Sequence, residues 1–175
     1  MRIRLAEAPD FAATLDFYHE ISDAMVGTPH DCAWRRGVHP SDEFIDRLVR
    51  DGGMLLAEDD SGLAGAVGFD NDLGHDYGPL PWRVDIPDAE AAVVHLLAVK
   101  QALRGQGLSR KLLRACIEEV RARGMRSLRL DATVNNAPAI ALYESEGFVR
   151  VGEGVQHIGP ADNPDIRLVV MELVL

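Results

Sequence analysis

The amino-acid sequence predicts an α/β fold in which a mixed central sheet carries helices on both faces. Strand-like and helix-like apolar patterns alternate along the whole chain, which favours a single layered domain over 1–175. The run AAVVHLLAV over 91–99 is apolar on both faces, as a strand at the centre of such a sheet would be. A chain of 175 residues is also long enough to bury a core without disulfide bonds.

Local signals define where the expected elements begin and end. Pro9 stands in the first turn of a helix, and Ser41 is a typical N-cap residue. Gly124 and Gly147 are typical of the position that follows a helix. In chain order the expected elements are a strand over 2–5, a helix over 8–26, a helix between Ser41 and Asp51, strands over 54–58, 63–69 and 91–99, a helix over 108–123, a strand over 127–133, a helix over 138–146, and strands over 148–155 and 166–175.

Charge and composition exclude several classes of protein. The formal net charge of −10 argues against a nucleic-acid-binding protein, which needs a dense basic surface. No run approaches the ~18 apolar residues of a membrane span, so we expect a soluble, cytoplasmic protein with no membrane partner. Cys32 and Cys116 are isolated and follow no metal-binding spacing, which suits a reducing cytoplasm and predicts no metal site.

The stretch RGQGLSRKLL, from Arg104 to Leu113, combines two glycines with basic side chains at the start of a helix. A P-loop is excluded, because G-x-x-x-x-G-K-[ST] cannot be fitted to it. A dinucleotide-binding turn is disfavoured, because residues 100–104 separate the strand from the first glycine and Arg110 occupies the third glycine position. Two interpretations stay open, a pyrophosphate cradle and a simple strand-to-helix connection with a solvated basic face.

The cradle interpretation rests on the chemistry of helix N-termini. Backbone N–H groups at the start of a helix have no partner within the helix, and the helix dipole adds partial positive charge. Gly105 and Gly107 would let phosphate oxygens approach a bare backbone, and Arg104, Arg110 and Lys111 would add charge.

Two segments carry a resemblance to a known family. They are HLLAVKQALRGQGLSRKLL, over 95–113, and NAPAIALYESEGF, over 136–148. From Val93 to Phe148 the chain resembles the GNAT superfamily of N-acetyltransferases, through its R/Q-x-x-G-x-G/A loop and its N-x-x-A-x-x-L-Y-x-x-x-G-F pattern. The chain departs from the first pattern at Ser109, where the family prefers Gly or Ala, although serine is also small.

The resemblance implies a fold in which splayed strands form an acetyl-CoA cleft, with acetyl-CoA as co-substrate. The backbone of Leu97, Ala98 and Val99 would pair with the pantetheine arm, and Asn136 would meet the cofactor from the other side as well as capping its helix. The residues implied in binding the pyrophosphate are those of the loop and first helical turn: Arg104, Gly105, Gln106, Gly107, Leu108, Ser109 and Arg110.

The resemblance also assigns the chemistry of transfer. Tyr143 matches the family's general acid, which gives a proton to the departing CoA thiolate. Two candidates stand for the general base, Asp131 on the next strand, ranked slightly first, and His95 on the strand before the loop. No cysteine lies in either motif, so direct transfer in a ternary complex is expected rather than an acyl-enzyme.

The acceptor and the assembly are less defined by the sequence. Loops usually carry specificity, and Trp34, Tyr77 and Trp82 in the irregular loops are candidates for binding a small-molecule or peptide amine. Trp34 fits a hydrophobic plug equally well. A non-catalytic, CoA-binding regulatory module is the alternative function. The apolar C-terminal strand fits a homodimer as well as a monomer that buries it centrally.

Overall fold

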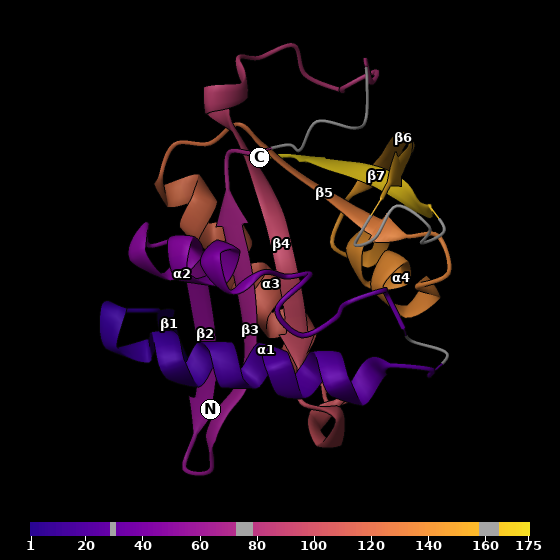
Figure 1. Cartoon of the computed structure of the whole chain (residues 1–175). Coiled ribbons are helices and arrows are strands. Elements are labelled where there is room, and N and C mark those ends of the chain that lie inside the picture. Colours follow the sequence, from indigo (N-terminus) through magenta and orange to yellow (C-terminus); the bar gives the residue numbers. More distant parts are fainter. Residues whose placement is uncertain (29–30, 73–78, 158–164) are drawn as a thin grey trace. The chain divides into compact units, whose positions relative to one another are not determined.

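The structure is a computed structural model, which describes residues 1–28, 31–72, 79–157 and 165–175 (Figure 1). These residues form two compact units. The first consists of Met1–Asp70 with His95–Cys116, and the second of Asn71–Val94 with Ile117–Leu175. Strand β4 (Ala91–Val99) and helix α3 (Leu108–Ala122) each contribute residues to both units.

Every strand and helix expected from the sequence is present. The strands are β1 (Arg2–Leu5), β2 (Met54–Asp59), β3 (Gly62–Asp70), β4, β5 (Ser127–Thr133), β6 (Val149–Gln156) and β7 (Ile166–Val174). The helices are α1 (Phe11–Met25), α2 (Asp42–Arg50), α3 and α4 (Ala137–Ser145), with short 3-10 turns at Ala8–Asp10, Asp88–Glu90 and Gln101–Leu103. The strand order is β1-β2-β3-β4-β5-β7-β6. The β4–β5 pair is parallel and the β1–β2, β2–β3, β5–β7 and β6–β7 pairs are antiparallel, which confirms the predicted mixed sheet.

In the first unit, α1 and α2 contribute to one hydrophobic core with the inward-facing side chains of β2, β3 and β4. Fully buried members of this core include Tyr18, Ile45 and Met54. The start of α2 is fixed as predicted, because the Ser41 hydroxyl accepts a hydrogen bond from the Phe44 N–H at 3.2 Å. Burial of these apolar side chains is the main term that stabilises the unit.

Two glycines of β3 show which helices lie on which face of the strand. A Cβ at Gly68 would lie 2.7 Å from Leu48 Cδ1 of α2, and a Cβ at Gly65 would lie 2.9 Å from Leu112 Cδ1 of α3. Residues three apart on a strand point to opposite faces, so α2 and α3 lie on opposite faces of β3. The prediction of helices on both faces is thereby confirmed for the first unit.

In the second unit, a buried charge pair ties a loop to the sheet. Arg129 of β5 and Glu172 of β7 are register partners, with side chains 2% and 0% exposed. Glu172 also accepts hydrogen bonds from the Ser127 hydroxyl at 2.7 Å and from the Arg83 N–H at 2.5 Å. The Arg129 guanidinium stacks on the Trp82 ring, and its Cζ atom lies 4.0 Å from the ring centroid. These contacts fix residues 82 and 83 against β5 and β7.

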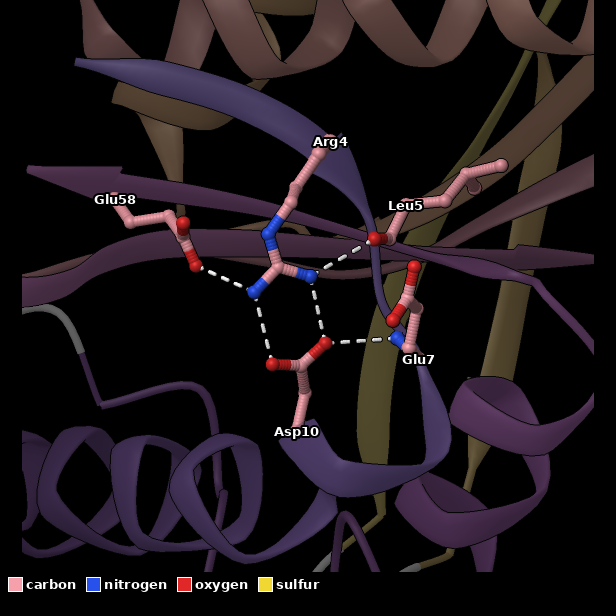
Figure 2. A network of polar contacts seen from close by, with 5 residues as sticks. All are labelled: Arg4, Leu5, Glu7, Asp10 and Glu58. Atoms are coloured by element: carbon pink, nitrogen blue, oxygen red, sulfur yellow. Dashed lines mark hydrogen bonds and ion pairs between the residues drawn. The ribbon is translucent and has the colours of Figure 1, made fainter.

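A polar network joins the first strand to the start of the first helix (Figure 2). The Arg4 guanidinium donates two hydrogen bonds to the Asp10 carboxylate, at 2.6 and 2.8 Å, and one to Glu58 at 2.6 Å. Asp10 accepts a further hydrogen bond from the Glu7 N–H at 2.7 Å. The hydrogen bonds from Arg4 hold the pKa of Asp10 at about 2, below the ordinary value of 3.8.

Because of this network, we expect part of the free energy of unfolding to be lost in acid. Because the pKa of Asp10 is lower in the folded chain, its contribution is present above pH 4 and is lost as the pH falls towards 2. Asp10→Asn should lower the free energy of unfolding by about 1–2 kcal/mol at pH 7, and this difference should shrink between pH 4 and 2. Urea unfolding across that range measures it, with Asp60→Asn in the exposed β2–β3 turn as control. A difference that does not depend on pH would contradict the assignment.

Candidate active site

Strand β4 is irregular at Leu96, whose φ of +56° lies in the left-handed region that non-glycine residues rarely adopt. Consecutive residues of a regular strand point to opposite faces, but here His95 contacts Phe44 of α2 and Leu96 lies in the core that α1 and α2 share. Two neighbouring side chains on one face are the mark of a bulge. The strand therefore changes its course in the middle of its length.

A buried tyrosine holds this bulge in place. The Tyr18 hydroxyl donates a hydrogen bond to the Leu96 carbonyl oxygen at 2.9 Å, and the side chain is fully buried. Burial raises the pKa of Tyr18 well above its usual value, so the phenol keeps the proton that it donates. The register of β4 with β5 covers Ala91, Ala92 and Val93, and Leu97–Val99 follow after the bulge.

The loop after β4 contains two glycines in the left-handed conformation. Gly105 and Gly107 have φ of +75° and +78°, and among the described residues no atom lies within 4 Å of a Cβ built at either position. A side chain would be strained there, and it would fill the open space above the loop. The first helical hydrogen bond of this turn runs from the Lys111 N–H to the Gly107 carbonyl oxygen at 3.1 Å. The N–H groups before Lys111 thus belong to the turn that has no acceptors inside α3.

The side chains around this loop make it basic and accessible. Arg104, Arg110 and Lys111 are exposed, whereas Leu108 is buried and anchors the start of α3. The Gln106 side-chain amide donates a hydrogen bond to the Ala102 carbonyl oxygen at 3.1 Å, which closes the loop on itself. A helix N-terminus, bare glycine backbone and exposed cations at one place can bind a phosphate-bearing ligand.

His95 forms a pair with an acidic residue of the neighbouring strand. Its Nε2 atom lies 2.8 Å from the Asp70 carboxylate at the end of β3. Asp70 also accepts a hydrogen bond from Arg47 of α2 at 3.0 Å. The Phe44 ring meets the imidazole edge-on, with centroids 5.3 Å apart, and the His95 side chain is 21% exposed. Contacts with Asp70 and Phe44 thus hold the imidazole in one orientation, and part of its side chain is still exposed to solvent.

In the second unit, α4 carries two residues of the predicted site. Asn136 caps the helix, because its side-chain oxygen accepts a hydrogen bond from the Ala139 N–H at 3.3 Å, and this predicted cap is confirmed. Tyr143 is buried on the same helix, and its ring centroid lies 5.8 Å from that of Phe148. Asp131 lies half-buried on β5.

The residues proposed for acceptor binding are placed differently from one another. Trp34 packs partly buried against the core of the first unit, with its ring 6.0 Å from Tyr18, which agrees with the plug interpretation. Trp82 lies on Arg129 in the second unit. Tyr77 lies outside the described residues.

Neither Cys32 nor Cys116 takes part in a disulfide, and neither is suited to carry an acyl group. Burial raises the pKa of Cys32 to about 11, so that little thiolate forms at neutral pH. Cys116 is fully buried in α3.

The sequence did not reveal three of these side chains. Tyr18 falls in the apolar stripe of its helix, a position that does not reveal that its hydroxyl has a specific acceptor. Asp70 follows an apolar strand, where a carboxylate is also typical of a turn. Arg129 alternates with apolar residues in β5, and only the register with β7 shows that Glu172 faces it.

The family model and the two curated relatives described here are all acetyltransferases. A family model described as the acetyltransferase (GNAT) family matches residues 14–148. A [ribosomal protein bS18]-alanine N-acetyltransferase of Haemophilus ducreyi is 34% identical over 86 residues, which are 49% of this chain and 59% of that protein. A streptothricin acetyltransferase of Streptomyces lavendulae is 34% identical over 124 residues, which are 65% of this chain and 61% of that protein. The chain thus spans less than two thirds of the length of these curated relatives.

Solved structures share the fold. A Salmonella typhimurium structure that contains acetyl-CoA as its cofactor has a TM-score of 0.69 and 23% identity, over 99% of this chain and 93% of that one.

Within the parts of the chain that the structure describes, no helix is both long and apolar enough to cross a membrane.

Proposed function

This chain belongs to the GNAT acetyltransferase family, and from that premise we propose that it transfers an acetyl group from acetyl-CoA to a primary amine. The acceptor is a small molecule or a peptide, and the reaction takes place in the cytoplasm. The observation that carries the proposal is the loop at Gly105 and Gly107. Its two left-handed glycines present bare backbone before α3, and no described atom beyond their chain neighbours lies within 4 Å of a Cβ built at either position.

Most of the groups that bind acetyl-CoA lie on β4 and in the loop that follows it. The backbone N–H groups from Gly107 to Arg110 and the side chains of Arg104 and Arg110 bind the pyrophosphate, with Gly105, Gln106, Leu108 and Ser109 shaping the loop. The backbone of Leu97, Ala98 and Val99 pairs with the pantetheine arm. The bulge at Leu96 supports this assignment, because it separates these residues from the part of β4 that is in register with β5.

The proposed acid is on α4. Tyr143 donates its phenolic proton to the CoA sulfur as the thioester carbon–sulfur bond breaks. Asn136 contributes a polar contact to the cofactor in addition to its cap. The amine attacks the thioester directly. The raised pKa of Cys32 and the burial of Cys116 support this route over an acyl-enzyme.

The acceptor is a peptide amine, as in the name of the bS18-alanine N-acetyltransferase, or a drug-like small molecule, as in the name of the streptothricin acetyltransferase. The formal net charge of −10 favours a cationic acceptor through electrostatic steering. A homodimer and the absence of a bound metal both stay predictions.

The test is release of free thiol from acetyl-CoA in the presence of a panel of amines. The panel holds a peptide with an alanine amine, streptothricin, and single amino acids, with N-acetylated alanine peptide as the blocked control. We expect thiol release with at least one free amine and none with the blocked peptide. Acetyl-CoA binding without thiol release for any amine would instead favour a non-catalytic, CoA-binding module.

A further inference from the structure

We propose that His95 is the general base of the transfer and that Asp70 is its positioning residue. The inference rests on the proposed function and assigns one of its open roles. His95 Nε2 and the Asp70 carboxylate form a hydrogen bond of 2.8 Å. The neighbours of this histidine in β4 are all apolar.

The hydrogen bond defines which nitrogen of the neutral ring can accept a proton. A carboxylate only accepts hydrogen bonds, so Nε2 must be the donor and must carry the ring proton. The lone pair then lies on Nδ1. Among the described residues, Asp70 at Nε2 is the only hydrogen-bond partner of this ring, so none of them competes for Nδ1.

The carboxylate itself is held from a second side. Arg47 donates to the other oxygen of Asp70 at 3.0 Å, and its guanidinium also lies over the Phe44 ring, 5.1 Å from the centroid. Phe44 in turn contacts the imidazole edge-on. The charged and aromatic groups of α2, β3 and β4 therefore form one connected cluster, consisting of Arg47, Phe44, Asp70 and His95. This cluster fixes both the position and the tautomer of the base.

The position on β4 suits the chemistry. His95 immediately precedes the bulge at Leu96, and Leu97–Val99 are the residues proposed to pair with the pantetheine arm. A base on the same strand can thus lie near the thioester, which follows the pantetheine. The residue also keeps contact with solvent, with 21% of its side chain exposed, so that an acceptor or one bridging water can reach it.

The transfer moves two protons away from the acceptor nitrogen and one onto the sulfur. The acceptor arrives as an ammonium ion, and Nδ1 of His95 takes one proton from it. The neutral amine nitrogen forms a bond to the thioester carbon, and the carbon–sulfur bond breaks with its electron pair on sulfur. Tyr143 gives its proton to that sulfur. The amide nitrogen loses its remaining extra proton, which restores the Tyr143 phenol, and His95 releases its proton to solvent.

The test compares His95→Ala, Asp70→Asn and the double variant, with Asp46→Asn as control. Asp46 is also paired with an arginine of α2, Arg50, whereas the carboxylate that pairs with His95 among the described residues is that of Asp70. We expect His95→Ala to lower kcat about 100-fold or more and Asp70→Asn about 10- to 100-fold. The double variant should be no slower than His95→Ala alone, because Asp70 acts only through the ring. Added imidazole should restore part of the turnover of His95→Ala and none of the turnover of Asp70→Asn.

Two readouts separate this inference from a structural role and from the proposed function. The affinity for acetyl-CoA should stay within about threefold of wild type in all four variants. The imidazole ¹⁵N signals of His95 in the wild-type protein without substrate should show the Nε2–H tautomer. In Asp70→Asn, the population of this tautomer should change. Asp131→Asn is measured beside these variants to test the rival base. An Nδ1–H tautomer, additive losses, or a larger loss from Asp131→Asn than from His95→Ala would each overturn the inference. If wild type acetylates no amine at all, the proposed function fails as well, whereas normal wild-type turnover with unaffected variants overturns this inference alone.

Discussion

Replacing Gly107 by glutamate is expected to abolish measurable acetyl-CoA binding. The residue has φ of +78°, so any side chain there is strained by roughly 1–2 kcal/mol. A carboxylate in the open space above the loop would also repel the pyrophosphate and occupy its place. Together these effects should weaken binding at least ~100-fold, which corresponds to about 3 kcal/mol. Calorimetric titration with acetyl-CoA measures the change.

Gly124→Glu is the matched control for this experiment. Gly124 follows the other end of α3, has φ of +81°, and likewise has no described atom within 4 Å of a Cβ. The substitution therefore adds the same charge and a similar backbone strain without touching the proposed cradle. It should bind acetyl-CoA as wild type does. Equal loss in both variants would mean that strain or net charge, and not the cradle, governs binding.

Replacing Tyr143 by phenylalanine is expected to separate turnover from cofactor binding. The substitution removes only the hydroxyl, and the ring keeps its packing against Phe148. A positioned acid contributes about 10²- to 10⁴-fold to such a step, so kcat should fall by at least ~100-fold. The affinity for acetyl-CoA should change little, because the phenol acts on the sulfur only as the bond breaks.

The thermal midpoint of Tyr143→Phe checks that the fold persists. A midpoint near that of wild type combined with lost turnover would support the acid role. Turnover within threefold of wild type would contradict the acid role. Tyr143 would then be only a buried core residue of α4.

Much of the fold follows from local signals in the sequence. The doubly apolar run of β4, the Ser41 and Asn136 caps and the glycine after α3 each act through neighbouring residues, and each was predicted correctly. The loop at Gly105 and Gly107 was predictable for the same reason, because a left-handed backbone is a property of the glycine itself.

The pairs that organise the site were not predictable in this way. His95 and Asp70 are 25 residues apart, and Tyr18 and Leu96 are 78 apart. Each contact depends on the alignment of β4 beside β3 or on the bulge at Leu96, which shifts two neighbouring side chains to one face. A single sequence contains no signal for that shift, so His95 could be named as a candidate base while its partner could not.

The most direct test of the account is calorimetric titration of the wild-type chain with acetyl-CoA and, separately, with NAD. The cradle at the start of α3 predicts a dissociation constant in the micromolar range for acetyl-CoA and no heat of binding for NAD. The absence of acetyl-CoA binding, or tighter binding of NAD, would contradict the assignment of this loop and with it the proposed transfer reaction.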